Sequence, residues 1–163
     1  MQPITFRKAS ERDIPVVLYF LNQWAHTSGQ KHQPVANEQM VQEHLFDRPG
    51  YMEIVFVIQE GEEVGFTQYT RRFSFMQGHY TILVQQLFVL PAHRGNGIGK
   101  ALFGYLLHHA HAQDCNLIEW QADASYCNST YFQSLGAKYK KHEKLFYLQV
   151  ALEEKPLYQN QKA

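Results

Sequence analysis

The sequence contains little cysteine and no long apolar run. Its 163 residues include only two cysteines, Cys115 and Cys127, and these lack C-x-x-C spacing. The sequence therefore predicts neither a disulfide framework nor a zinc site. No apolar stretch approaches the ~18 to 20 residues needed to cross a bilayer, and the first residues lack an apolar signal core. We therefore expect a cytoplasmic protein whose two thiols are buried.

The chain also lacks an excess of either charge. Fifteen Lys and Arg residues balance fifteen Asp and Glu residues, which argues against a broad nucleic-acid or anionic-membrane surface. The chain is 45% apolar and holds 11 Phe and 10 Tyr, enough for a packed interior. Without repeats or a low-complexity linker, this length predicts one domain over residues 1–153, with a polar tail at 154–163. Composition leaves the oligomeric state, including a homodimer, open.

Hydrophobic periodicity predicts an α/β (α+β) fold. Strands joined by hairpins, together with strand-to-helix crossovers, favour a mixed sheet with helices on its faces. Asp13 is a candidate N-cap for the first helix, and Pro15 is tolerated because it lies in the first turn. Strands are expected at about 3–8, 54–58, 64–75, 80–90, 117–120 and 145–150, and helices from Ile14 to about Trp24 and over 37–46, 98–112 and 126–135.

A glycine-rich turn between the strand that ends at Leu90 and the helix that begins at Ile98 is the most informative segment. Its sequence is Arg-Gly-Asn-Gly-Ile-Gly-Lys at 94–100. The first amides of a helix have no partner within the helix and lie at the positive end of its dipole, so the turn is suited to an anion. Arg94 and Lys100 add positive charge, and the glycines let a phosphate approach the backbone. The turn predicts a phosphate or pyrophosphate site.

Spacing decides between the known phosphate-binding motifs. A Walker A loop would need Gly at position 94 and Ser or Thr at position 101, where the chain has Arg94 and Ala101. The dinucleotide motif G-x-G-x-x-G matches Gly95 and Gly97 but meets Lys100 at its third glycine. The pattern that fits is Arg-x-x-Gly-x-Gly at 94–99 behind Leu87-Phe88-Val89. In this pattern, and in its late element Tyr131 to Ala137, the chain resembles the GNAT superfamily of acyl-CoA N-acyltransferases, nearest the branch of small-amine and polyamine acetyltransferases.

The resemblance implies a mostly antiparallel sheet of 6–7 strands flanked by about four helices, with acetyl-CoA as cosubstrate. The strand backbone would bind the pantetheine arm, the turn amides would bind the pyrophosphate, and the strand at 117–122 would splay away to admit the thioester. The cofactor-binding residues implied in this way are Leu87, Phe88, Val89, Arg94, Gly95, Asn96, Gly97, Ile98, Gly99, Lys100, Ser125, Asn128 and Phe132.

The catalytic positions depart from the family pattern. Relatives often carry Phe-Tyr where this chain has Tyr131-Phe132, and Asn where it has Ser125. A shift of one residue turns a helical side chain by ~100°, so Tyr126 and Tyr131 are both candidates for the general acid. Gln85 and Gln86 stand where small-amine relatives have Glu-Asp, and an amide cannot accept a proton at neutral pH. Water held by these amides is one candidate base, and the others are Glu53, His79, Glu119 and Asp123.

The function expected from the resemblance is transfer of an acetyl group from acetyl-CoA to a primary amine of a small molecule. The two Gln residues weaken the attraction for polyamines, since carboxylates would bind such cations better. The alternatives are an acyl-CoA-binding module without catalysis, motivated by Ser125 and Phe132, and a protein or peptide N-acetyltransferase. His108, His109 and His111 lack a His-Glu-x-x-His arrangement, so no metal is expected. The expected partners are acetyl-CoA and the amine, not a nucleic acid or a membrane.

Overall fold

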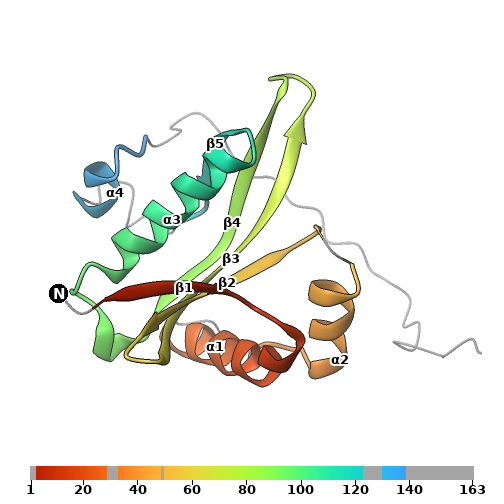
Figure 1. The fold of residues 1–163 in the computed structure, drawn as a ribbon, viewed down its shortest axis with the longest axis vertical. Coiled ribbons are helices and arrows are strands. Elements are labelled where there is room, and N and C mark those ends of the chain that lie inside the picture. The colour runs from red at the N-terminus through yellow and green to blue at the C-terminus, as the bar shows by residue number, and fades with distance from the viewer. Residues whose placement is uncertain (1–2, 29–32, 49, 123–129, 139–163) are drawn as a thin grey trace, which may run out of the picture.

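A five-stranded sheet forms the centre of the computed structural model, which describes residues 3–28, 33–48, 50–122 and 130–138 (Figure 1). The strands are β1 (Ile4–Lys8), β2 (Glu53–Gln59), β3 (Glu62–Ser74), β4 (His79–Val89) and β5 (Cys115–Trp120), and each lies beside the next in chain order. The pairs from β1 to β4 are antiparallel, whereas β5 is parallel to β4. A mixed, mostly antiparallel sheet is therefore confirmed.

The expectation of six to seven strands is wrong for the described residues, which form five. The resemblance supplied that number, and the periodicity supplied only one strand beyond β5. That sixth strand, predicted at 145–150, lies outside the described residues.

Helices cover both faces of the sheet. On one face lie α1 (Ile14–Thr27) and α2 (Glu38–Val41), which continues as the π-helix η2 (Gln42–Phe46); on the other lie α3 (Ile98–Ala112) and α4 (Thr130–Ser134) (Figure 1). Short 3-10 helices, η1 (Glu11–Asp13) and η3 (Pro91–His93), lead into α1 and follow β4. The four predicted helices are thus present, and the last is described only from Thr130. None of the described helices has both the length and the apolarity needed to span a bilayer.

An aromatic cluster fills the space between α1 and the sheet. Phe20 of α1 is 1% exposed. Its ring centroid lies 5.8 Å from that of Phe56, 5.4 Å from that of Phe66 and 6.5 Å from that of Phe88. These three rings come from β2, β3 and β4, so one face of three strands is fixed against one helix. The odd-even alternation of strands then tells which other side chains share this face.

The opposite face packs against α3. Leu102 and Leu106 of α3 are fully buried, and Ile82 and Val84 of β4 belong to the same layer. Cys115 is also buried there, as predicted for the thiols, while Cys127 lies outside the described residues. The sheet is therefore covered on both faces, which explains why β2 is a nearly continuous apolar run.

Asp13 precedes α1, as predicted, but its side chain does not cap the helix. Its carboxylate instead accepts two hydrogen bonds from the Arg7 guanidinium, at 2.7 and 3.0 Å, and two from the backbone and hydroxyl of Ser10. These bonds, that from Arg7 foremost, lower the pKa of Asp13 to about 2. The carboxylate joins β1 to the start of α1, and through the Ser10 amide it closes a capping box at η1 rather than at α1.

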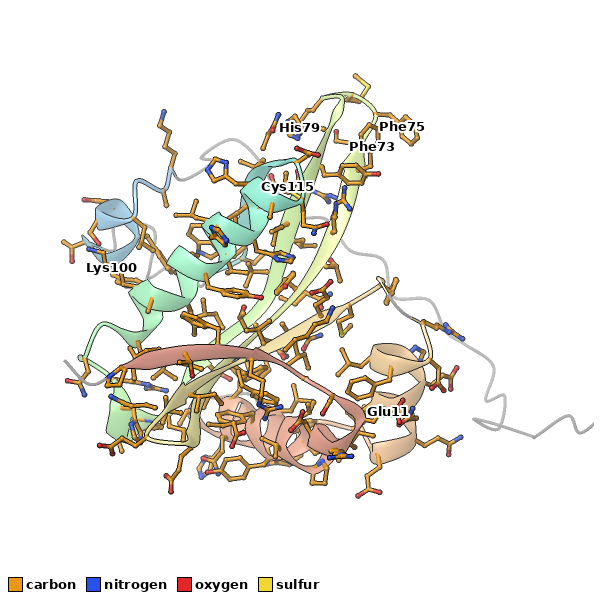
Figure 2. All side chains as sticks on the ribbon, in the orientation of Figure 1. Glu11, Phe73, Phe75, His79, Lys100 and Cys115 are labelled. Atoms are coloured by element: carbon orange, nitrogen blue, oxygen red, sulfur yellow. The ribbon has the colours of Figure 1, made fainter. Side chains whose placement is uncertain are left out.

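The hairpin of β3 and β4 extends past the rest of the sheet (Figure 1). Phe75 and Met76 at its tip are 94% and 96% exposed. Phe73 packs against Phe75 and against Tyr80, with ring centroids 5.1 and 4.9 Å apart. Figure 2 shows Phe73, Phe75 and His79 together at this end, away from Lys100 near the start of α3.

Candidate functional site

Strand β4 contains a bulge at Gln85. Gln68 of β3 lies opposite Gln86, and the next residue, Tyr69, lies opposite Val84, so Gln85 has no partner in β3. An extra residue in one strand exchanges the two faces beyond it. Val84 accordingly points toward α3, whereas Phe88 points toward α1. The periodicity of the sequence gave no sign of this change.

Beyond the bulge, β4 has an open edge. β5 pairs with β4 only from Tyr80 to Val84, while β4 continues to Val89. Leu90 donates its N–H to Val64 of β3. Antiparallel alternation then directs the backbone groups of Leu87 and Val89 away from β3, toward this edge. The separation of β5 from β4 that the resemblance implies agrees with this register.

A close approach of β3 supports the same stretch of β4. A methyl group on Gly65 would lie 2.7 Å from the carbonyl oxygen of Phe88 and 3.3 Å from Cα of Val89. Only glycine therefore allows β3 to lie so near to β4 here. The open edge of β4 is held from its other side by backbone atoms.

The glycine turn leads from this edge into α3. Gly97 is the N-cap with φ of 77°, a left-handed conformation that favours glycine, and no side chain caps the helix. The first bond of the helix joins the Ala101 N–H to the Gly97 carbonyl. The amides of Ile98, Gly99 and Lys100 therefore have no acceptor within the helix and lie at its positive end.

The space over the turn is open. A Cβ atom at Gly95 or Gly97 would meet no atom of the described residues within 4 Å. Asn96 and Lys100 are exposed, so Lys100 contributes its charge from the rim of the turn. The predicted glycine residues are thus brought together as a cradle of backbone amides suited to an anion.

Arg94 lies between the open edge and the turn. Its Nε donates a 2.9 Å hydrogen bond to the Val89 carbonyl, and its guanidinium lies 5.3 Å from the centre of the Phe88 ring. The side chain therefore secures the end of β4. Its charge lies beside the open edge as well as beside the turn.

The two aromatic residues of α4 take different positions. A Cβ atom at Gly99 would lie 2.8 Å from the hydroxyl oxygen of Tyr131, so this hydroxyl sits over the first turn of α3. Burial raises the pKa of Tyr131. Phe132 instead packs against Trp120 of β5, with ring centroids 5.3 Å apart. The Tyr131-Phe132 order thus places the hydroxyl at the glycine turn and an apolar ring against β5.

Several predicted residues are not part of the described structure. Tyr126, the other candidate acid, and the candidate base Asp123 lie outside the described residues, as do Ser125 and Asn128.

Glu53 lies on the face of the sheet that packs against α3, rather than beside the amide side chains of Gln85 and Gln86. It is opposite Tyr69, accepts a 3.0 Å hydrogen bond from the Tyr69 hydroxyl and pairs with Lys8 at 3.2 Å. Burial and the Glu53 charge raise the pKa of Tyr69, which therefore stays protonated.

A pocket of about 150 Å³ lies beside Glu53 and Tyr69, at the far end of α3 from the glycine turn. Its lining residues are Gly50, Tyr51, Met52, Glu53, Tyr69, Thr70, Arg71, Ile82, His109, Gln113 and Cys115.

The remaining described base candidates are also placed by their contacts. His79 begins β4, at the hairpin end remote from the bulge. Glu119 of β5 lies opposite Leu83 and forms a 2.6 Å ion pair with Arg72. Neither contact forms part of the glycine turn.

One residue at the bulge was missed by the sequence reasoning. Gln68 lies opposite Gln86, and its Nε2 donates to Oε1 of Gln85 at 2.9 Å and to Sδ of Met52 at 2.9 Å. Gln68 and Gln86 are 18 positions apart, so only the hairpin register brings them together. A sequence signal could have been Gln68 itself, an amide between the buried Thr67 and Tyr69 of β3.

An open strand edge that leads into an anion-binding turn defines a ligand-binding α/β domain for an extended molecule with a phosphate group. The family described as Acetyltransferase (GNAT) family matches residues 18–136. The chain therefore belongs to the GNAT acetyltransferase family. No curated protein matches it.

Solved structures share the fold at low sequence identity. The integron cassette protein VCH_CASS6 of V. cholerae is 20% identical, over 91% of this chain and 93% of that chain, with a TM-score of 0.72. The aminoglycoside acetyltransferase meta-AAC0020 from an uncultured soil metagenomic sample is 15% identical, over 90% and 96%, with a TM-score of 0.76. The ribosomal-protein-alanine N-acetyltransferase of Brucella melitensis biovar Abortus 2308 is 17% identical, over 91% and 100%, with a TM-score of 0.69. These likenesses show the fold.

Members of the family use acetyl-CoA as acyl donor, and the site fits such a molecule. The open edge offers the backbone groups of Leu87 and the N–H of Val89 to an amide-containing arm, because Arg94 already occupies the Val89 carbonyl. The turn offers the amides that begin α3 to a pyrophosphate. The open space over Gly95 and Gly97 leaves room for the phosphates.

Proposed function

We propose that the protein transfers an acetyl group from acetyl-CoA to a primary amine of a small molecule. The observation that carries this proposal is the continuity of the open edge of β4 with the glycine turn. Acetyl-CoA, when bound, supplies the acyl thioester. The edge at Leu87 and Val89 orients its arm, and the amides of Ile98 to Lys100 hold its phosphates.

The acyl end would lie at the bulge, where β5 leaves β4. Gln85 lies opposite no residue of β3, and the backbone of this bulge is the proposed donor to developing negative charge on the acyl oxygen. The departing thiol has a pKa of ~8.5, so it leaves readily without a strong acid. Tyr131 and Tyr126 remain proposed acids, and the Tyr131 hydroxyl lies at the turn.

The related structures do not decide between acceptors. One relative is an aminoglycoside acetyltransferase and another a ribosomal-protein-alanine N-acetyltransferase. The first name points to a small molecule and the second to a protein. We therefore propose a small amine as acceptor and a peptide amine as the alternative, and a panel of both distinguishes them.

The direct test is release of free thiol from acetyl-CoA. Purified protein is incubated with acetyl-CoA and a panel of amino acids, aminoglycosides, polyamines and peptides, and CoA is titrated as it forms. Turnover with a small amine supports the proposal. Silence across the panel contradicts it.

A matched pair of glycine variants tests the location of the donor site. Gly97 and Gly78 both have positive φ, 77° and 71°, and at both a Cβ atom would meet open space. Val costs similar backbone strain at each position. We expect Gly97→Val to weaken CoA binding in calorimetry at least 10-fold, because its side chain occupies the phosphate space, and Gly78→Val at the hairpin tip to leave it unchanged. Equal affinities for CoA would refute the placement.

A non-catalytic acyl-CoA-binding module is favoured by one observation. Phe132 packs on Trp120, so the described part of α4 provides no hydroxyl at the position where relatives have Tyr. Tight binding of CoA without thiol release would support this second function. Thiol release that is lost in Tyr131→Phe or Tyr126→Phe would contradict it.

A further inference from the structure

Three amide side chains meet at the bulge, on the α1 face of the sheet. Phe66 and Phe88 face α1, and Gln68 and Gln86 each lie two residues from one of them, on the same face. Gln68 donates to Gln85 Oε1, which joins two of the amides. Gln86 is the third.

The amide oxygen of Gln86 is buried and has no hydrogen-bond partner in the described part of the chain. A buried acceptor without a partner is destabilising, so one retained in a folded protein requires an explanation. The oxygen lies on the strand that bears the open edge, one residue beyond the bulge. A ligand that brings an N–H group to this place would satisfy it.

No described carboxylate or imidazole forms a hydrogen bond with these three amides. Glu53 lies on the α3 face, bonded to Tyr69 and Lys8. On the α1 face, the Glu119 carboxylate is held by Arg72 at 2.6 Å. The elements that cover this face add further titratable groups, none of which is bonded to the three amides: Tyr19 and His26 of α1, Glu38 of α2, and Glu43 and His44 of η2.

We propose that the acceptor is a primary amine of low pKa that enters uncharged and is oriented by donating one N–H to Gln86 Oε1. The inference rests on the proposed acetyl transfer. The nitrogen lone pair forms the bond to the acyl carbon while the carbon–sulfur bond breaks. One proton leaves the nitrogen through water, and one proton ends on the sulfur, so the products are the amide and the free thiol.

The substrate class follows from the fraction of amine that is uncharged. An α-amino group with a pKa of ~8 is about one-quarter neutral at pH 7.5, whereas an alkylamine with a pKa near ~10.4 is about 0.1% neutral. No described carboxylate is bonded to these amides to take the proton, and the uncharged fraction of the first amine is larger roughly 200-fold. The acceptor is therefore an α-amino compound or another amine whose neighbouring groups lower its pKa.

The pH dependence of kcat/KM with two amines tests this directly. Glycinamide represents the low-pKa class and n-propylamine the alkylamines. We expect glycinamide to be preferred at least 50-fold at pH 7.5, and log kcat/KM to rise with slope one up to the pKa of each amine. A break at one common pH for both amines, or a preference for n-propylamine, overturns the inference while leaving acetyl transfer intact. Absence of thiol release with every amine overturns the proposed function and this inference with it.

Variants of Gln86 separate recognition from a structural role. Gln86→Leu should raise KM for glycinamide roughly 3- to 10-fold and leave KM for acetyl-CoA unchanged, without loss of stability, because the buried oxygen has no partner to lose. Gln86→Glu should increase the relative kcat/KM of n-propylamine, since a carboxylate binds its ammonium form. Gln77→Leu, at the exposed hairpin tip, is the matched control. A destabilised Gln86→Leu protein with an unchanged KM for the amine would overturn the assignment.

Discussion

The contact between Gly99 and Tyr131 gives a test of how α4 lies on the beginning of α3. A methyl group on Gly99 would lie 2.8 Å from Oη of Tyr131 and 3.6 Å from its Cζ. The first distance is too short for any real contact, and the second is an ordinary one. Gly99→Ala therefore collides with a single oxygen atom, and Tyr131→Phe removes that atom.

The magnitude follows from two opposing terms. Ala in place of Gly within a helix stabilises by about 0.5–1 kcal/mol, whereas overpacking costs about 1–3 kcal/mol. Tyr131 is 38% exposed and can turn partly toward solvent, which places the collision near the lower limit. We expect Gly99→Ala to lower the free energy of unfolding by about 0.5 kcal/mol in the wild-type background and to raise it by about 0.5 kcal/mol beside Tyr131→Phe.

The assay is urea unfolding of the two single variants and the double variant, followed by tryptophan fluorescence. Gly104→Ala is the control, because it lies in the same helix and its Cβ atom would meet nothing within 4 Å. It should stabilise by about 0.5–1 kcal/mol with or without Tyr131. If Gly99→Ala and Tyr131→Phe add within about 0.3 kcal/mol, the placement of the hydroxyl over the turn is refuted.

Two further predictions concern stability. Asp13→Asn should lower the free energy of unfolding at pH 7 by about 2 kcal/mol, because Arg7 holds the pKa of Asp13 at about 2 against 3.8 ordinarily. That stability is present above about pH 4 and is lost as the pH falls toward 2. Acid unfolding of the variant should therefore show a weaker pH dependence over this interval than that of the wild type. Unchanged acid unfolding would contradict the ion pair. Gly65→Ala should lower the free energy of unfolding by at least about 2 kcal/mol and raise KM for acetyl-CoA. The reason is that the methyl group would lie 2.7 Å from the Phe88 carbonyl, and backbone atoms cannot move away as a side chain can. Wild-type thermal stability and KM in this variant would exclude the close approach.

The glycine turn and its helix are the part of the site that the sequence predicts best. Their signals are local: an apolar strand, glycines at fixed spacing and an amphipathic run, and α3 begins and ends at the predicted residues. The hairpin of β3 and β4 is also local, and Gly78 in its turn has positive φ. The resemblance to the family depended mainly on the same glycine turn.

The acyl end of the site could not be predicted, because it depends on register. The bulge at Gln85 is visible only once β3 and β4 are paired, and it decides that Gln86 shares a face with Phe88 rather than with Val84. Asp13 was expected to cap a helix, yet its partner Arg7 comes from a strand. Pairing between separate elements overrides local propensity in both cases.

Because of the bulge, the number of residues in β4, rather than their identity, determines the structure at the acyl end of the site. Any substitution at Gln85 keeps the extra residue and so keeps both halves of the strand in phase with their neighbours. Removal of the residue would make Val84 and Gln86 direct neighbours, whose side chains point to opposite faces, so Gln86 and Phe88 would stay on the α1 face and only the bulge would be lost. Point substitutions at Gln85 therefore leave the bulge in place, and single-residue deletion is the change that removes it. Among relatives of this chain, the length of this strand should carry information about the acceptor that residue identities do not.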